Sequence, residues 1–423
     1  DRRGAVTGME SILIVGSGQA GVQIAVSLRE LGYRGRISLV GSEPHAPYQR
    51  PPLSKAFLVG DAEASSLDLR NVAFYVEPGI DVHVSERVIS VDHDGYRGTA
   101  TTDCGRTLTF DGLALATGVR PRRLTVPGAD ARGVHYLRTL DDAATLRRAL
   151  SDHERGPGTV AVVGGGFIGL EIAAACRARG IWATVIETAP RVMARAVSPE
   201  MSTTLERAHQ ETGARILLGS TVEEVVTSDG QVSAVRTEDG QLIECGVVVV
   251  GIGSLPRTEL AEQLGLRCDN GIVVDEACRT SVPSIVAAGD CSVFQPAWAP
   301  RPVRLESVPN ATDQGRIAAA ALLGIKPAPQ PPPWFWSDQG ALKLQLAGWT
   351  AESDRRVVRR ATGSAPLSIV HYVDERMVGV EALNSPHDFS AVKRALVTGD
   401  SFPPEAVGDV RVHLKDLLAT TQR

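Results

Sequence analysis

Two stretches of this chain share one pattern, in which an apolar run leads into a glycine-rich loop and then into a helical pattern. The glycines of the two loops are Gly16, Gly18 and Gly21, followed later by Gly164, Gly166 and Gly169. An apolar run suits a strand buried on both faces of a parallel sheet, and this glycine spacing lets backbone approach a pyrophosphate at a helix N-terminus. One such loop could serve packing alone, but two complete units predict two bound dinucleotides.

Each unit has an acidic residue at or just after its second strand. Glu43 follows the strand expected over 36–40, and Glu187 ends the strand expected over 183–187. A carboxylate there can accept hydrogen bonds from a ribose, although Glu43 could equally be a solvated turn residue. Because a carboxylate would repel a 2′-phosphate, Glu187 favours NAD over NADP, with Arg191 and Arg195 nearby as opposing charges.

Composition limits the classes that remain. At 423 residues the chain predicts two or three domains, and its net charge of −5 argues against a general nucleic-acid binder. We expect no membrane span, since no apolar run approaches the ~18–20 residues needed, and no secretion signal in Asp1–Gly8. The cysteines and histidines are scattered without C-x-x-C or zinc spacing, which predicts no metal site and a cytoplasmic location with reduced thiols.

Other segments carry polar or small residues at places where a ligand could bind. The rigid turn Pro47–Lys55 holds Arg50 and Lys55, and a strand expected over 108–115 runs into Ala116, Thr117 and Gly118. A strand is also expected over 82–91, and the buried run from Val282 ends at Asp290. Each residue has a plainer interpretation as well: Lys55 as a solvated lysine, and Asp290 as a helix cap.

The last quarter of the chain reads as a separate part. Five prolines in Pro327–Pro333 predict a stiff connector, and the strand-rich segment after it opens with Trp334, Phe335 and Trp336. Such aromatic residues more often belong to a core, but stacking on a ring system is an open alternative.

Taken in order, these segments resemble the NADH-dependent, FAD-containing ferredoxin reductases of bacterial oxygenase systems, the putidaredoxin reductase and rubredoxin reductase group. The resemblance runs from about Met9 to the C-terminus. Its markers are the two glycine loops with Leu170–Glu171 after the second, Arg50–Lys55, Ala116–Arg122, Ala288–Asp290, Glu306–Ala311 and Trp334–Gln339.

The resemblance implies an α/β fold, glutathione-reductase-like, with two Rossmann-like dinucleotide-binding domains and a C-terminal α+β domain. The NAD domain is inserted in the FAD domain, so FAD is held by two separated segments. The implied boundaries are 9–119 and 252–328 for the FAD domain, 120–251 for the NAD domain and 329–423 for the C-terminal domain.

The resemblance also implies the site residues. FAD would be held by Gly16, Gly18, Ala20, Gly21, Ser42, Glu43, Arg50, Lys55, Val88, Ala116, Thr117, Gly118, Arg122, Arg138, Asp290, Val308 and Trp336. NAD would be held by Gly164, Gly166, Ile168, Gly169, Glu171, Glu187 and Gly253. Lys55, Glu171 and Trp336 would be catalytic: Lys55 near the reactive N5 side of the flavin, Glu171 near the nicotinamide, and Trp336 covering part of the flavin.

The implied function takes hydride from NADH onto FAD and passes single electrons to an iron–sulfur protein, ferredoxin or rubredoxin, which feeds a cytochrome P450 or a ring-hydroxylating dioxygenase. The enzyme would be a monomer or weak homodimer that binds neither nucleic acid nor membrane. The sequence departs from the family pattern at two places. Ser42 replaces an aspartate where the ribose would bind, and Gly340 and Ala341 replace Tyr-Asp on the side of the electron acceptor.

Cysteine placement separates this function from thiol-based relatives of the same architecture. Those enzymes need a cysteine on an early helix beside the flavin, or C-x-x-C in the NAD domain, whereas here the first cysteine is Cys104 and Cys176 stands alone. Two alternatives stay open: an NADH-sensing flavoprotein resembling apoptosis-inducing factor, and a flavin enzyme acting directly on a small molecule. Basic residues that could dock an acidic acceptor are Arg301, Arg304, Lys343, Arg355, Arg356, Arg359 and Arg360.

Overall fold

A computed structural model describes residues 8–76, 79–153, 159–360 and 366–420 of the chain. The prediction that Asp1–Gly8 contain no secretion signal concerns residues that lie, except for Gly8, outside the described part. The chain forms two compact units, each built from three separate segments. The first unit contains the described residues of Asp1–Gln49, Leu67–Arg120 and Leu255–Pro333, and the second contains those of Arg50–Ser66, Pro121–Ser254 and Trp334–Arg423.

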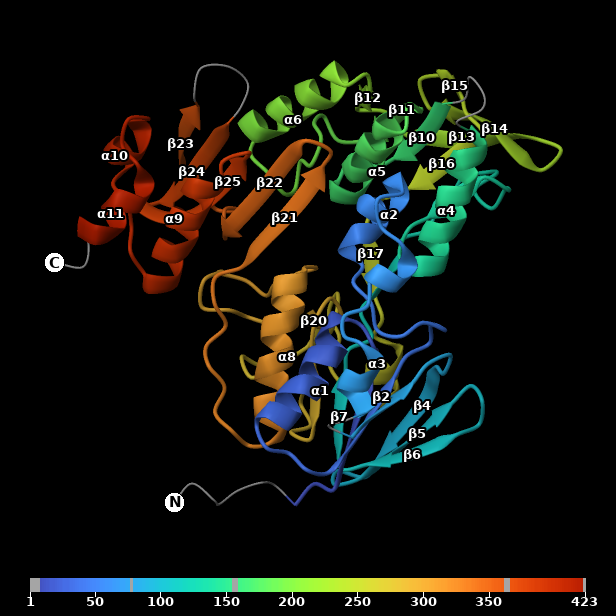
Figure 1. Ribbon diagram of the computed structural model, residues 1–423, viewed down its shortest axis with the longest axis vertical. Helices are drawn as coiled ribbons and strands as arrows, with labels where there is room; N and C mark the ends of the chain where they lie inside the picture. Colours follow the sequence, from blue (N-terminus) through green and yellow to red (C-terminus); the bar gives the residue numbers. More distant parts are fainter. Residues whose placement is uncertain (1–7, 77–78, 154–158, 361–365, 421–423) are drawn as a thin grey trace. The chain divides into compact units, whose positions relative to one another are not determined.

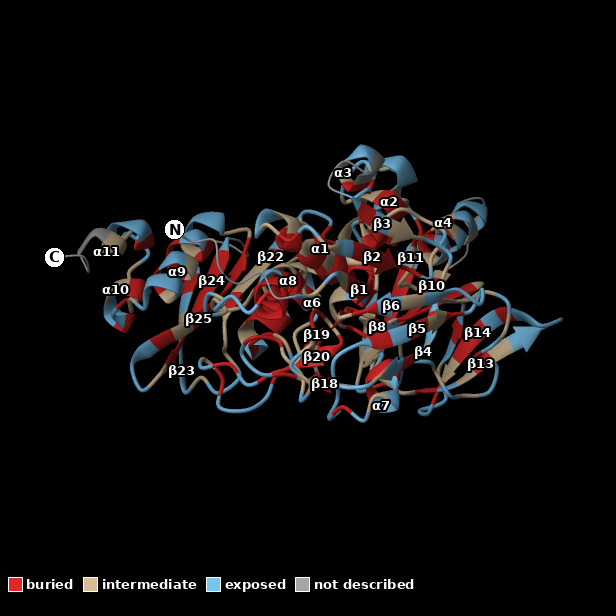
Figure 2. Ribbon diagram, turned by 90° about the horizontal axis from the view of Figure 1, so that it is seen from below, coloured by how far each residue is buried: buried red, intermediate tan, exposed pale blue. Residues whose placement is uncertain are grey.

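The first unit is built on a five-stranded parallel sheet in the order β19-β7-β1-β2-β3. Its strands are β1 (Ser11–Val15), β2 (Arg36–Val40), β3 (Ile80–His83), β7 (Gly112–Leu115) and β19 (Ile285–Ala287). Helices α1 (Gln19–Glu30) and α8 (Val308–Leu322) lie side by side (Figure 1), and α8 is buried along most of its length (Figure 2). They approach closely because Gly315 has no side chain; a Cβ there would lie 2.7 Å from Cβ of Gln23.

The remaining elements of the first unit are short. A second sheet is antiparallel and consists of β4 (Val88–His93), β5 (Gly98–Thr102) and β6 (Thr107–Phe110). The others are α3 (Val72–Val76), α7 (Glu259–Gln263), β18 (Ile272–Val273) and β20 (Ser292–Val293). Two of the passages of the chain between the units lie within β8 (Val119–Pro121) and β17 (Ser254–Pro256).

Two strand predictions in this unit were wrong about continuity. The run 108–115 divides into β6 and β7, which belong to different sheets, because the carboxylate of Asp111 accepts the N–H groups of Glu10 (2.8 Å) and Ser11 (2.9 Å) at the point of division. The run 82–91 divides into β3 and β4 at Ser85, whose φ of 56° is not a strand conformation. Alternation alone shows neither the side-chain bond nor the turn.

The second unit contains another five-stranded parallel sheet, in the order β12-β11-β10-β16-β9. Its strands are β9 (Val134–Tyr136), β10 (Thr159–Val163), β11 (Trp182–Glu187), β12 (Arg215–Leu218) and β16 (Val247–Val250). The helices of this part are α4 (Leu140–His153), α5 (Phe167–Ala178) and α6 (Pro199–Glu211). Turns at Asp229-Gly230 and Asp239-Gly240 join β13 (Val222–Ser228), β14 (Gln231–Thr237) and β15 (Leu242–Glu244).

The turn that carries Arg50 and Lys55 belongs to the second unit. It forms η1 (Pro51–Ser54) and α2 (Ala56–Val59), and η2 (Ala64–Ser66) follows. Leu58 is fully buried in the same apolar cluster as Leu146 of α4 and Leu170 of α5. Its carbonyl oxygen accepts a hydrogen bond from Nη1 of Arg179 at 3.0 Å. This packing holds Lys55 over the first turns of α5.

The C-terminal segment forms an antiparallel sheet in the order β21-β22-β25-β24-β23, followed by three helices. The elements are β21 (Trp334–Gln339), β22 (Leu342–Gly348), β23 (Arg355–Arg360), β24 (Leu367–Val373), β25 (Arg376–Leu383), α9 (Pro386–Thr398), α10 (Pro404–Gly408) and α11 (Leu414–Thr420). Leu344 and Ile369 of this sheet share an apolar cluster with Leu170 and Leu205 of α5 and α6. No helix in the described part is both long and apolar enough to cross a bilayer.

Candidate functional site

The first glycine loop follows β1 and needs glycine at two positions for packing. Gly16 has a φ of +112°, and a Cβ there would lie 2.0 Å from the carbonyl oxygen of Ala116. A Cβ on Gly21 would lie 1.8 Å from the carbonyl oxygen of Gly16. Gly18 differs, since its Cβ would meet nothing within 4 Å and no side chain caps α1, which begins just after it. The first N–H groups of α1, including that of Ala20, are thus placed to receive an anion.

The same edge of the sheet gathers three other predicted segments. Strands β19, β7 and β1 are parallel and adjacent, with Val15 opposite Leu115 and Leu115 opposite Ala287. The loops that begin at Gly16, Ala116 and Ala288 therefore leave at one edge, where parallel sheets bind ligands. Thr117, Gly118 and Asp290 lie in these loops, and Val308 is the first residue of α8.

Glu43 and Val88 are tied to the loop after β2. The carboxylate of Glu43 accepts a hydrogen bond from the Tyr48 hydroxyl at 2.5 Å, and its carbonyl oxygen accepts the N–H of Ser85. These bonds bring the segment before Val88, which starts β4, next to Glu43. Ser42 is exposed and offers only its hydroxyl where relatives have a carboxylate.

Sequence reasoning missed Gln314, a fully buried residue of α8 beside the turn at Gly289. Its Oε1 accepts the Gly289 N–H and the Ser292 hydroxyl, both at 2.8 Å, which fixes the orientation of the amide. Its buried Nε2 has no hydrogen-bond partner among the described residues.

The second glycine loop repeats the first within the second unit. Cβ atoms would lie 2.5 Å from the Gly251 carbonyl oxygen at Gly164 and 1.9 Å from the Gly164 carbonyl oxygen at Gly169, whereas a Cβ on Gly166 would meet nothing within 4 Å. Ile168 on the first turn of α5 is 42% exposed, high for isoleucine.

Glu187 closes this loop through its side chain. Its carboxylate accepts the N–H of Gly165 at 2.6 Å and the N–H of Ala189 at 2.8 Å. Arg191 donates to the carbonyl oxygens of Val197 (2.7 Å) and Ala194 (2.6 Å). The guanidinium of Arg191 is therefore engaged by backbone carbonyl oxygens.

Four further predicted residues of this unit form two pairs, each through a backbone carbonyl oxygen. The carbonyl oxygen of Gly253 accepts the N–H of Arg122 at 2.9 Å, and a guanidinium N–H of Arg50 donates to the carbonyl oxygen of Arg138 at 2.7 Å. Arg50 and Arg138 are thus placed together, and so are Gly253 and Arg122.

The strongest polar cluster of the second unit surrounds Glu171 on α5. This side chain is 2% exposed, and its Oε1 lies 2.9 Å from Nζ of Lys55 and 2.6 Å from the Ser337 hydroxyl, which donates to it. The Ser54 hydroxyl donates to Oε2 at 2.5 Å. Two donors come from η1 and its C-terminal end and one from β21, so three separate segments complete the cluster, and sequence reasoning missed both serines.

Alternation along β21 explains how Trp336 lies relative to this cluster. Phe335 packs on Phe167 of α5, with ring centroids 4.5 Å apart, and Ser337 reaches Glu171 on the same face. Trp336 therefore lies on the other face, stacked on Trp334 at 5.5 Å. Gly340, with a φ of +65°, forms the turn into β22, which gives this departure from the family pattern a backbone reason.

Thiol chemistry finds no support in the cysteines. All six are free thiols, and four are buried. Burial raises the pKa of Cys176 and of Cys245 to about 12, so neither is a thiolate at neutral pH.

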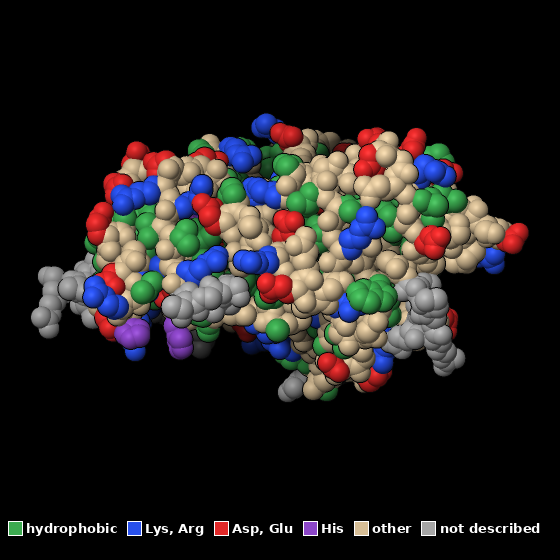
Figure 3. All heavy atoms as spheres, turned by 90° about the horizontal axis from the view of Figure 1, so that it is seen from above, with side chains coloured by type: hydrophobic (Ala, Val, Ile, Leu, Met, Phe, Trp, Pro, Cys, Tyr) green, Lys and Arg blue, Asp and Glu red, His purple; other side chains and the backbone are tan. Residues whose placement is uncertain are grey.

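The candidate docking arginines of β23 have carboxylate or hydroxyl partners. Arg355 pairs with Glu375 at 2.6 Å, Arg356 with Glu200 at 3.3 Å, and Arg360 donates to the Thr204 hydroxyl at 3.0 Å. Lys343 likewise pairs with Asp338 at 3.1 Å, and Arg304 pairs with Glu306 at 2.5 Å and is 11% exposed. Figure 3 shows basic and acidic side chains interspersed on one face of the molecule.

Arg359 was misplaced among surface residues, since its side chain is only 7% exposed. It pairs with Asp388 at 3.2 Å and donates to the carbonyl oxygens of Asp409 and Val412, both at 2.9 Å. Its guanidinium thereby joins β23 to α9 and to the segment after α10. It is a structural residue.

We predict that Arg359→Leu lowers the free energy of unfolding by about 3–5 kcal/mol, because it leaves the partly buried carboxylate of Asp388 and several carbonyl oxygens without their partner. Arg355→Leu on the same strand is the control, because the ion pairs of Arg355 with Glu375 and Glu405 are exposed and their loss should change stability little. Thermal unfolding of both variants measures the difference. Equal melting temperatures would contradict the assignment.

The residues of both units fit dinucleotides. Each glycine loop has an open helix N-terminus, and a carboxylate lies at the end of each second strand or just after it. Comparison with known proteins agrees with this. Residues 10–315 match the pyridine nucleotide-disulphide oxidoreductase family, and residues 334–418 match the reductase C-terminal family. The chain belongs to the pyridine nucleotide-disulphide oxidoreductase family.

Its relatives narrow the group further. It is 44% identical to rhodocoxin reductase of Rhodococcus erythropolis, over 97% of this chain and 94% of that one, and 39% identical to putidaredoxin reductase of Pseudomonas putida, over 98% of both. The crystal structure of the ferredoxin reductase for the CYP199A2 system from Rhodopseudomonas palustris superposes with a TM-score of 0.92 at 41% identity, covering 96% and 99% of the two chains. The sequence-based assignment to the flavoprotein ferredoxin reductases is confirmed, and the protein is an oxidoreductase that uses FAD and NAD(H).

Proposed function

We propose that this enzyme oxidises NADH and reduces a small iron–sulfur protein, a ferredoxin or rubredoxin, that serves a cytochrome P450 or ring-hydroxylating oxygenase. The observation that carries it is the Glu171 cluster, whose described donors are an ammonium and two hydroxyls, with no thiol among them. Electrons that cannot leave through a cysteine pair must leave the flavin for an external acceptor. A relative supports that acceptor class, since putidaredoxin reductase was solved as a covalent complex with putidaredoxin, at 38% identity and a TM-score of 0.93 over 98% of this chain and 99% of that one.

When bound, NADH supplies a hydride, and FAD accepts it and releases its electrons singly. The protein residues then have distinct roles. The helix N-termini after Gly18 and Gly166 bind the pyrophosphates, and Glu43 and Glu187 accept hydrogen bonds from the riboses. Lys55 would stabilise negative charge on the reduced ring system, and the Glu171 carboxylate and the carbonyl oxygen of Pro51 hold its ammonium in place. Trp336 covers part of the ring and keeps water from it.

The test is a cytochrome c reduction assay with NADH or NADPH, run with and without added ferredoxins and a rubredoxin. We expect strong stimulation by at least one of these proteins and a clear preference for NADH. If none of them accelerates reduction, while small-molecule acceptors do, the proposed acceptor class is wrong.

We infer that the enzyme works in the cytoplasm as a monomer or weak homodimer. Six free thiols suit a reducing compartment. Size-exclusion chromatography with light scattering across a concentration series measures the oligomeric state.

We predict that Glu187→Gln lowers the preference for NADH over NADPH by about tenfold, because it removes the charge that repels a 2′-phosphate. The ratio of kcat/KM for the two nucleotides measures this. Exposed Glu223 on β13 offers a matched control, since Glu223→Gln makes the same chemical change in the same unit and should leave the ratio unaltered. An unchanged ratio in the Glu187 variant would rule out the role of this carboxylate.

A further inference from the structure

Behind Glu171, buried polar side chains continue the cluster away from Lys55. Ser337 and Gln339 of β21 are 0% and 2% exposed, and His209 of α6 is 2% exposed. Nε2 of Gln339 donates to Oγ of Ser337 at 3.2 Å, and Oε1 of Gln339 lies 2.8 Å from Nε2 of His209. The line His209–Gln339–Ser337–Glu171 thus joins three elements of the second unit and ends on the carboxylate that pairs with Lys55.

The hydroxyl of Ser337 has one hydrogen, so its neighbours decide where that hydrogen points. Glu171 lies on one side at 2.6 Å, and Gln339 lies on the other. When Gln339 presents its N–H to Ser337, the hydroxyl oxygen accepts that bond and its own hydrogen points to the carboxylate of Glu171. If the amide were reversed, its oxygen would compete with Glu171 for the same hydrogen.

Two contacts hold the amide in the first orientation. Nε2 of Gln339 lies 3.8 Å from Sδ of Met193, a weak acceptor that matches an N–H and not an oxygen. Oε1 faces Nε2 of His209, so this ring nitrogen must carry a hydrogen. Burial lowers the pKa of His209, which leaves a neutral ring protonated on Nε2 as the form that satisfies the amide.

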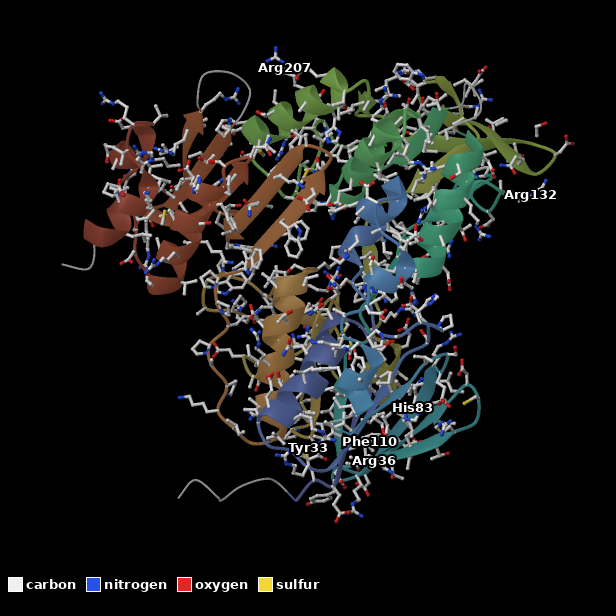
Figure 4. All side chains as sticks on the ribbon, in the orientation of Figure 1. Tyr33, Arg36, His83, Phe110, Arg132 and Arg207 are labelled. Atoms are coloured by element: carbon white, nitrogen blue, oxygen red, sulfur yellow. The ribbon has the colours of Figure 1, made fainter. Side chains whose placement is uncertain are left out.

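The position of His209 on α6 suits this inward role. Arg207, two residues earlier, projects from the helix away from the rest of the unit (Figure 4), and its side chain is 74% exposed. Residues two apart on a helix point in nearly opposite directions, so His209 faces inward, toward β21. The burial of His209 follows from its place on α6 and does not depend on the glycine loop or on the turn that carries Lys55.

We propose that His209 is a positioning residue that acts through Gln339 and Ser337 to fix the third hydrogen bond on Glu171, and so sets how tightly that carboxylate holds Lys55. The proposal rests on the proposed function, in which Lys55 faces the reacting ring. When the Ser337 hydroxyl donates its hydrogen to Glu171, this hydrogen bond stabilises part of the negative charge of the carboxylate. Without it, Glu171 draws more strongly on the Lys55 ammonium and less positive charge remains for the reduced flavin.

The test compares His209→Leu with His209→Gln, because glutamine can place an N–H near the position of Nε2 and leucine cannot. In single-turnover reduction by NADH, we expect His209→Leu to be slower by about fivefold, the effect of one hydrogen bond, with an unchanged Kd for NADH. We also expect a more negative flavin reduction potential in His209→Leu. His209→Gln should stay close to the wild type in both readouts, and so should His387→Gln, which alters an exposed histidine of the same unit.

A wild-type rate and potential in His209→Leu would overturn the proposal, and so would equal impairment of the leucine and glutamine variants. A second measurement needs no variant: ¹⁵N NMR of selectively labelled wild-type enzyme should show a neutral His209 ring protonated on Nε2 near neutral pH. Protonation on Nδ1 instead would also overturn it. Failure of the proposed function gives a different result. In that case NADH reduces the wild-type enzyme but no iron–sulfur protein reoxidises it, and the rate of flavin reduction and the flavin potential can still be measured.

Discussion

Lys55→Met is expected to slow reduction of the bound flavin by NADH by about 100-fold, the loss typical of removing one preorganised group that stabilises developing negative charge. Lys55 is 17% exposed, and its ammonium is held 2.9 Å from the buried carboxylate of Glu171. The lysine is therefore fixed before the substrate arrives, and methionine replaces it with an uncharged side chain of similar length. Stopped-flow absorbance of the flavin measures the rate.

The variant also leaves Glu171 buried with two hydroxyl donors and no cation, and this alone could destabilise the protein. The double variant Lys55→Met/Glu171→Gln separates the two effects. It should recover the melting temperature, since no unpaired charge remains, and it should stay slow, since the cation is still missing. If the double variant regains the wild-type rate, Lys55 serves only to neutralise Glu171, and the catalytic role of Lys55 is wrong.

The glycine loops could be predicted from the sequence because their requirements are local. Gly21 and Gly169 meet the carbonyl oxygens of Gly16 and Gly164, five residues earlier, and Gly16 and Gly164 themselves have the positive φ values that favour glycine. The acids after the second strands are equally local, because a parallel strand of fixed length ends at the same sheet edge as the loop.

The rest of the candidate site depends on contacts between residues far apart in the chain. Ser337 and Glu171 are separated by 166 positions, and Gln339 and His209 by 130. Periodicity shows which face of β21 is buried, but it does not show which helix packs against that face. His209 has no signal of its own in the sequence, whereas Ser337 and Gln339 lay inside a segment already chosen as a family marker.

The same limit explains the errors among the arginines. The four arginines of Arg355–Arg360 favour the solvated side of a strand, and β23 confirms the strand. Arg359 is nevertheless buried, because α9 and the segment after α10 cover it and supply a carboxylate and carbonyl oxygens. A charged residue in a strand is assigned to solvent by default, and only the tertiary partners reverse that assignment.

Valine substitutions at Gly18 and Gly166 should show which unit binds which cofactor. Gly18 and Gly166 have φ values of −79° and −83°, which any residue adopts, and a Cβ at either position meets nothing within 4 Å. Valine should therefore be tolerated in the fold but occupy the space where a pyrophosphate approaches the helix N-terminus. Gly18→Val should weaken FAD binding and Gly166→Val should weaken NADH binding, each by about 100-fold, as expected when several hydrogen bonds to phosphate are lost.

Each variant is the control for the other. Gly166→Val should be purified with a full complement of flavin and, once reduced by dithionite, should pass electrons to the acceptor at the wild-type rate. Gly18→Val should be purified without flavin and should still bind NADH, as measured by isothermal titration calorimetry. Gly21→Val, in contrast, places a side chain 1.8 Å from the Gly16 carbonyl oxygen and should fail to fold. Loss of NADH binding in Gly18→Val together with loss of flavin in Gly166→Val would reverse the assignment of the two loops. Each substitution reports which dinucleotide has its pyrophosphate at that helix N-terminus.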